Sequence, residues 1–269
     1  MALSLLNNVS SLEAQNELNQ TSASLQKVLV QLSSGSRLNS GADDPAGLSI
    51  ADSLHASEAM LSQASSNANT GIGLLQTADG SLGQITNLLD RAVTLATEAA
   101  NGGLTTSQLG ALDNEYQSIQ AEITRIGGQT TFNGSSVFTA STTSIFLGST
   151  TNSIGVTIGT LSATTLALNT TKLDTSGHAG TALDAINAAV LTVASSRGTL
   201  GATLNRLTAA QNVISNQVTN ITSAENLIRA ANIPQDVAEE SQLSVLEQTG
   251  ISALTQANNQ SQQILRLFQ

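Results

Sequence analysis

Apolar residues recur along much of the chain at the spacing of helices that pack along one stripe. In the segment 54–96, every seventh residue is apolar, and in the segment 109–126 apolar residues follow one another in steps of three and four. Glycine pairs at 102–103 and 127–128 follow these two segments, and such pairs are typical of helix ends. The pattern therefore predicts two consecutive helices that pack as in a coiled coil.

The longest stripe runs over residues 183–228, where eleven of fourteen seam positions are apolar. A helix of this length extends over about 70 Å, whereas a compact globule of this size is only about 45 Å across. We therefore expect a rod. The polar exceptions on the stripe are Arg197, Gln211 and Glu225. They either fix the register of the packed helices, as polar seam residues do, or lie at the edge of the stripe and reach water.

Both ends of the chain carry shorter stripes with apolar residues at similar spacing, and Pro234 separates the C-terminal one from the long stripe. An isolated amphipathic helix is only marginally stable in water. We therefore predict that the terminal segments pair with each other and with neighbouring copies of the chain. The apolar residues expected to carry this assembly are Leu18, Leu25, Leu32, Leu243, Leu246, Leu254, Ile264 and Leu267.

The segment 129–175 differs in composition from the helical segments, because it is rich in Thr, Ser and Gly. Two short β-type runs, at 144–148 and 153–159, lie on either side of a turn-like Ser-Thr-Thr-Asn and predict one or two hairpins. The expected fold class is therefore mainly α: a long antiparallel coiled-coil or helical-bundle rod with a small β-hairpin element and paired terminal helices.

The composition is polar without being charged, because only 10% of the residues are charged and only 2% are aromatic. A net charge of −10 argues against binding to nucleic acid, which requires clustered basic residues. The absence of cysteine removes thiolate chemistry. No apolar run is long enough for a membrane span, and the first residues lack the features of a cleavable signal peptide.

Few residues suggest a catalytic or metal-binding site. His55 has Asp52 and Glu58 three residues away on either side, but a metal or catalytic site needs further ligands that the sequence does not suggest. We expect a surface or interface histidine, and no enzyme activity, cofactor or metal. The Asp43-Asp44-Pro45 run reads as a helix start. Four glycines lie inside the first long stripe, where they are expected to permit close helix packing: Gly71, Gly73, Gly80 and Gly83.

Several ordered motifs near both ends resemble those of the bacterial flagellins. They are LSLLNN at 3–8, LSSGSRLNSGADDPAGLSIAD at 32–52, QASSNANTGIGLLQTADG at 63–80, GQTTFNG at 128–134, ITSAENLIRAANI at 221–233 and ISALTQANNQSQQILRLF at 251–268. The centre of the chain carries no such motif. The resemblance implies a short flagellin that lacks large outer domains.

The resemblance also implies a domain plan and a function. Residues 1–42 with 230–269 would form the helical inner-tube domain, 43–140 with 176–229 the coiled-coil rod domain, and 141–175 a small β-hairpin segment of the rod. The chain would be exported and assemble with itself into the extracellular flagellar filament that drives motility. An export chaperone at the C-terminal segment, cap proteins and hook-associated proteins would be its other partners, with no role for nucleic acid or membrane.

Two groups of site residues follow from the resemblance. A polar, uncharged run would line the central channel of the filament, or else form a solvated helix face: Gln256, Asn259, Gln260 and Gln263. The surface that the flagellin-sensing Toll-like receptor recognises in this family maps onto Arg91, Leu95 and Glu115. Thr94 stands here where the family usually has glutamate.

Two other functions remain as alternatives. A hook-filament junction protein shares the terminal coiled-coil plan, and it would be present in a few copies per filament instead of thousands. A soluble enzyme or ligand-binding rod would need a catalytic constellation, which the sequence does not offer.

Overall fold

The computed structural model describes residues 8–149 and 152–267, and of Ser149, Ser261 and 264–267 only the backbone. This part of the chain forms five helices: α1 (Val9–Ser34), α2 (Pro45–Ala99), α3 (Thr106–Gln129), α4 (Ser176–Arg229) and α5 (Ile233–Leu267). Two antiparallel hairpins lie between α3 and α4, formed by β1 (Thr131–Phe132) with β2 (Ser135–Ser136) and by β3 (Thr143–Ser149) with β4 (Asn152–Val156). The expected fold class, mainly α with a small β-hairpin element, is confirmed.

The chain divides into two compact units, and one of them combines both ends of the sequence. The terminal unit comprises residues 1–58 and 220–269, and the central unit comprises residues 59–219. Helices α2 and α4 contribute residues to both units. None of the helices in the described ranges is long and apolar enough to cross a membrane.

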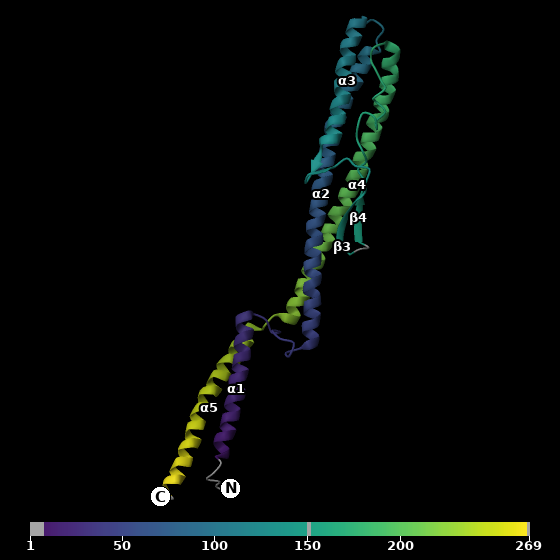
Figure 1. Ribbon diagram of the computed structural model, residues 1–269. Coiled ribbons are helices and arrows are strands. Elements are labelled where there is room, and N and C mark those ends of the chain that lie inside the picture. The colour runs from purple at the N-terminus through teal and green to yellow at the C-terminus, as the bar shows by residue number, and fades with distance from the viewer. Residues whose placement is uncertain (1–7, 150–151, 268–269) are drawn as a thin grey trace. The chain divides into compact units, whose positions relative to one another are not determined.

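The central unit is built around a continuous apolar core between α2, α3 and α4 (Figure 1). Its core contains 32 buried apolar residues. Leu75, Leu82 and Leu89, which follow the seven-residue spacing, are among them. The stripe therefore faces the core as its spacing predicts, and burial of this stripe offsets the poor helix propensity of the glycines within α2.

Helix α3 begins at a capping box, in which Thr105 accepts a hydrogen bond from the backbone N–H of Gln108 and the Gln108 side chain accepts one from the N–H of Thr105. The predicted helix end at the pair Gly127–Gly128 falls slightly too early, since α3 continues to Gln129. A Cβ on Gly127 would overlap the carbonyl oxygen of Leu161. Glycine is needed there because another backbone approaches the helix closely, not because the helix ends.

The β3–β4 hairpin packs on α2, and two of the α2 glycines accommodate the segment that follows α3. A Cβ on Gly71 would overlap the side chain of Ile145, and one on Gly73 would touch Phe132 at 3.4 Å. Gly80 and Gly83 have nothing within 4 Å of such a Cβ. The expectation that these glycines permit close helix packing is therefore corrected: Gly71 and Gly73 make room for hairpin side chains.

The segment 157–175, between β4 and α4, is held on α3 by hydrogen bonds. The buried Asp113 accepts one from the backbone N–H of Leu173 at 2.7 Å. The Tyr116 hydroxyl bonds to Thr171 Oγ1 at 2.6 Å. These bonds satisfy polar groups that the core would otherwise leave unpaired, which is costly in a buried position. The segment thereby becomes a fixed part of the central unit.

In the terminal unit, α1 and α5 lie side by side and run antiparallel (Figure 1). Helix α1 ends at Gly35, whose φ of +66° suits glycine. The chain then bonds to the connection between α4 and α5, where the Arg37 N–H donates to the Arg229 carbonyl at 2.7 Å. The Asp44 carboxylate caps α2 by accepting from the N–H groups of Ala46 and Gly47, which confirms the predicted helix start.

Candidate assembly surface

The terminal unit buries few of its apolar residues. Within the described residues it buries Val28, Leu38 and Ala51, whereas the central unit buries 32. Among the same described residues it leaves eleven large apolar side chains exposed: Val9, Leu12, Leu29, Val30, Ile50, Leu227, Ile233, Val237, Val245, Leu246 and Ile251. The central unit leaves four. This imbalance indicates that the isolated chain leaves much of the apolar surface of its terminal unit uncovered, most of it on α1 and α5.

The eight apolar residues predicted to carry assembly divide into three groups. Five are half-buried: Leu18, Leu25, Leu32, Leu243 and Leu254. Leu246 is 47% exposed. Ile264 and Leu267 belong to α5, but their side chains lie outside those that the structure describes. Whether any of these residues contacts a neighbouring copy stays a prediction.

Several outward-facing apolar residues of α1 and α5 were not predicted from the seven-residue spacing. Val9, Leu12 and Val245 are among the most exposed of them, yet they do not follow the seven-residue spacing of the leucines. Their signal in the sequence is that both terminal helices carry apolar residues on more than one face, which an isolated helix pair cannot bury.

Hydrogen bonds between polar groups also join the two ends of the chain. The Asn8 side chain donates to the Ala257 carbonyl at 3.1 Å, and Ser22 donates to Glu247 at 2.9 Å. Gly250 faces Leu18, so that a Cβ added to Gly250 would lie 3.2 Å from a Leu18 methyl group. The small residue lets the helices approach closely at this point. Such contacts orient α1 and α5, but each contributes only about 1 kcal/mol.

The predicted channel-lining residues form an exposed polar stripe on α5. Gln256, Asn259, Gln260 and Gln263 are all exposed, and their spacing of three and four residues places them on one face of the helix. The stripe carries no charge. Its assignment to a channel or to a solvated face stays a prediction.

The three polar seam residues of α4 each contact a polar side chain of α2 within their own unit. Arg197 bonds to Asp79 at 2.8 Å, and Gln211 bonds to Asn69 at 2.8 Å, both in the central unit. Glu225 lies 3.6 Å from the His55 ring in the terminal unit. Arg197 and Asp79 remain partly exposed, so their pair lies at the edge of the seam. Each polar residue of α4 nevertheless faces a polar partner on α2, as expected of residues that fix the register.

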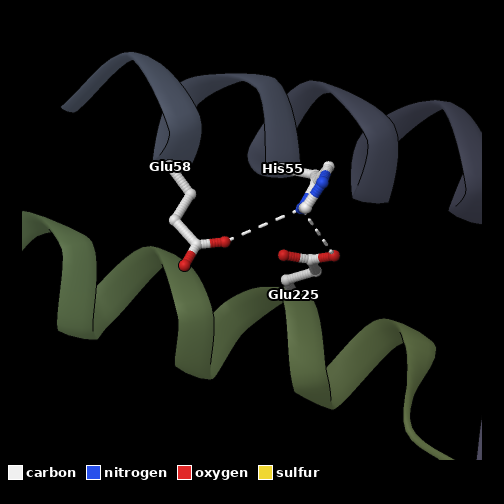
Figure 2. A group of neighbouring side chains, drawn as sticks. All are labelled: His55, Glu58 and Glu225. Atoms are coloured by element: carbon white, nitrogen blue, oxygen red, sulfur yellow. Dashed lines mark ion pairs between the residues drawn. The ribbon is translucent and has the colours of Figure 1, made fainter. Parts of the chain in front are cut away.

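His55 faces two carboxylates from two helices (Figure 2). Its Nδ1 lies 3.7 Å from Glu58 Oε2 on α2 and 3.6 Å from Glu225 Oε1 on α4. Sequence spacing brought His55 together with Glu58 but did not suggest Glu225, which is distant along the chain and was recognised only as a polar seam residue. The three side chains gather because α2 and α4 run past each other at this point.

The residues predicted to correspond to the family's receptor surface differ in accessibility. Arg91 on α2 pairs with Glu115 on α3 at 2.8 Å, and this hydrogen bond lowers the pKa of Glu115. Both side chains are exposed. Leu95 is 0% exposed within the core of the central unit. Leu95 therefore offers no surface to a partner of the folded chain, and receptor contact stays a prediction for Arg91 and Glu115.

These features define a helical structural protein in which the two ends of the chain form one unit with exposed apolar helices. Family models agree with this class. The bacterial flagellin N-terminal helical region matches residues 5–143, and the bacterial flagellin C-terminal helical region matches residues 183–268. The chain belongs to the bacterial flagellin family and is a structural subunit of the bacterial flagellar filament.

Individual relatives give the same result. The chain is 32% identical to a flagellin of Halalkalibacterium halodurans over 90% of its own length and 91% of that protein. The crystal structure of Bacillus cereus flagellin is 30% identical and matches with a TM-score of 0.51, covering 60% of this chain and 94% of that one.

A hook-associated protein has a similar fold. The structure of a putative flagellar hook-associated protein from Vibrio parahaemolyticus matches with a TM-score of 0.59, covering 70% of this chain and 99% of that one. At 14% identity this likeness shows the fold alone. The two matching flagellin family models and the flagellin of Halalkalibacterium halodurans favour the filament subunit over the junction protein.

Proposed function

We propose that α1 and α5 supply the contacts between neighbouring subunits in the filament. In this proposal residues 1–42 with 230–269 form the inner-tube domain, 43–140 with 176–229 form the rod domain, and 141–175 form its hairpin segment. The observation that carries the proposal is that nine of the eleven large apolar side chains left exposed among the described residues of the terminal unit lie on α1 and α5.

The energetic argument concerns the area that these side chains expose. Each of the eleven is at least 43% exposed, so covering one by a neighbour contributes on the order of 1 kcal/mol. A contact between different faces of identical subunits generates a helical polymer when its rotation does not close into a ring. Assembly then completes the burial that the isolated terminal unit lacks.

A matched pair of substitutions on α5 tests this proposal. Val245 is 63% exposed, so Val245→Asn is expected to leave the thermal unfolding of the monomer unchanged while reducing seeded polymerisation, measured by sedimentation and electron microscopy. Ser244→Asn, at the adjacent exposed position, introduces the same side chain without loss of apolar area. Equal polymerisation of both variants and the unsubstituted chain would contradict an assembly role for Val245.

The proposal extends to the polar stripe of α5 as the lining of the channel. An uncharged lining does not hold a passing chain segment of either sign by electrostatic attraction. Replacing Gln256 and Gln260 together with lysine is expected to shorten filaments and lower motility. Lysine at Gln76 and Gln217, two exposed positions of the central unit, adds the same charge elsewhere. Normal filaments from the first variant would favour a solvated face.

Other partners belong to the same proposal. An export chaperone would cover the apolar residues of α5 before secretion, and cap and hook-associated proteins would contact the ends of the filament. The exposed Arg91–Glu115 pair would contribute to contact with the flagellin-sensing Toll-like receptor. A reporter-cell titration that compares the purified monomer with its Arg91→Ala variant measures this contribution, and equal response curves would remove Arg91 from the contact.

A further inference from the structure

We propose that His55, Glu58 and Glu225 form a binding site for a first-row divalent metal ion, for which Zn²⁺ is the probe. The site lies within the terminal unit, where residues of α2 and α4 face each other (Figure 2). It is independent of the proposed assembly contacts on α1 and α5.

The spacing of the three ligand atoms matches the size of a metal ion. Zinc binds imidazole nitrogen and carboxylate oxygen at about 2.0–2.2 Å, and a tetrahedral arrangement then places ligand atoms about 3.4 Å apart. His55 Nδ1 lies 3.7 Å from Glu58 Oε2 and 3.6 Å from Glu225 Oε1. All three ligand atoms lie within 4.8 Å of one another. Small side-chain adjustments would bring them to bonding distance.

The charge around the site favours a cation. Asp52, Glu58 and Glu225 supply three carboxylates, and Arg229 supplies one guanidinium that bonds to Glu225 at 3.2 Å and lies 3.8 Å from Asp52. The group therefore has an excess of negative charge when His55 is neutral, which is the form of imidazole that binds metals. A divalent ion would neutralise this excess.

The surroundings orient the ligands and leave a way in. Glu58 Oε1 accepts a hydrogen bond from Thr222 at 3.3 Å, which leaves Glu58 Oε2 facing His55. Arg229 donates to Glu225 Oε1, the oxygen that faces His55, so this carboxylate is held in place and would bind the ion through the remaining lone pair of that oxygen. The Glu225 side chain is 12% exposed, while that of His55 is 65% exposed. An ion can enter from the His55 side and keep water in its fourth coordination position.

The chain contains an internal control. It has two histidines, and His178 forms an exposed pair with Asp174, four residues earlier in the chain. Among the described residues, the group at His55 is the one set of three or more His, Asp or Glu ligands with this spacing. A metal-specific effect should therefore distinguish His55 from His178.

The test is a titration of the full-length monomer with zinc. Calorimetry measures the binding, and the NMR signals of the two imidazole rings show which histidine takes part. We expect one site per chain, with shifts of the His55 signals and none of the His178 signals. His55→Gln should weaken binding more than about tenfold, because removing a ligand costs at least as much as removing one of its orienting partners. Glu225→Gln should weaken it similarly, and His178→Gln should leave it unchanged.

Two results would overturn the proposal. One is unchanged His55 signals in the presence of excess zinc, which would leave His55 as an ion-pair partner only. The other is equal zinc affinity of the His55→Gln variant and the unsubstituted chain. Circular dichroism of each variant verifies the fold, and the exposure of His55 makes His55→Gln the variant least expected to disturb it.

Discussion

Gly71 and Gly80 both lie inside α2, yet they have different surroundings. Gly71 is buried against Ile145 of the hairpin, whereas Gly80 has open space around it. The same residue type therefore serves packing at one position and costs helix stability at the other. Nothing in the local sequence distinguishes the two, because both lie between apolar residues of one stripe.

This difference predicts opposite effects of the same substitution. Gly71→Ala should destabilise the central unit by about 1–3 kcal/mol through overpacking. Gly80→Ala should stabilise it by up to about 1 kcal/mol, since alanine has the higher helix propensity. Denaturant unfolding of the two monomeric variants measures both values. Equal effects of the two substitutions would contradict the packing role of Gly71.

Asp43 connects the link between α1 and α2 to α1 itself. Its carboxylate pairs with Lys27 at 2.8 Å and accepts backbone hydrogen bonds from Asn39 and Ser40. The hydrogen bond from Lys27 is the largest cause that lowers the pKa of Asp43 to about 2. A carboxyl group whose pKa is lower in the folded chain stabilises the fold at pH values above its unfolded pKa.

The stabilisation by Asp43 should therefore be present above the unfolded pKa of about 4 and be lost as the pH falls through the folded pKa of about 2. Asp43→Asn is expected to destabilise the terminal unit at pH 7 and to approach the stability of the unsubstituted chain as the pH falls through about 2. Unfolding of monomers followed across this range measures the difference, and Lys27→Gln should reproduce most of it. A difference that does not vary with pH would contradict the ionic origin.

At the scale of elements, the antiparallel register of α4 on α2 is marked by polar pairs in the central unit. Arg197 meets Asp79 and Gln211 meets Asn69, each across an otherwise apolar seam. The spacing of polar exceptions on α4 was visible in the sequence. Their partners on α2 were not, because residues in two distant segments become neighbours only when the helices dock.

The Arg197–Asp79 pair is expected to make a small contribution to the free energy of unfolding. Arg197→Glu should destabilise the central unit by about 1 kcal/mol or less, since exposed ion pairs are weak and like charges repel. Combining it with Asp79→Arg should restore most of the loss. A double-mutant cycle from denaturant unfolding gives the coupling energy. A coupling energy of zero would leave these residues as solvated side chains at the edge of the seam.

At the scale of the whole molecule, the two units differ in how far they bury their own apolar residues. The central unit closes a core that lies entirely within residues 64–214. The terminal unit has no comparable core among its described residues. Folding of the central unit should therefore not require the last part of α5, whereas assembly should.

Deleting residues 250–269 is expected to abolish polymerisation and leave a soluble monomer with an intact central unit. Tyr116 is the single tyrosine of the chain and is buried in that unit, so its fluorescence reports whether the core persists. Sedimentation after seeding measures assembly. Filament formation by the truncated chain would contradict the role proposed for α5.

The sequence by itself determined the helices, their buried faces, the hairpin and the family, because periodic burial and local turn chemistry leave a signal in neighbouring residues. Leu75, Leu82 and Leu89 are buried as their spacing predicts. Only the tertiary structure decided that Glu225 joins His55, that Gly127 makes room for Leu161, and that Leu95 is buried. These relationships join segments far apart in the chain, and the docking of helices creates them, so no local pattern records them.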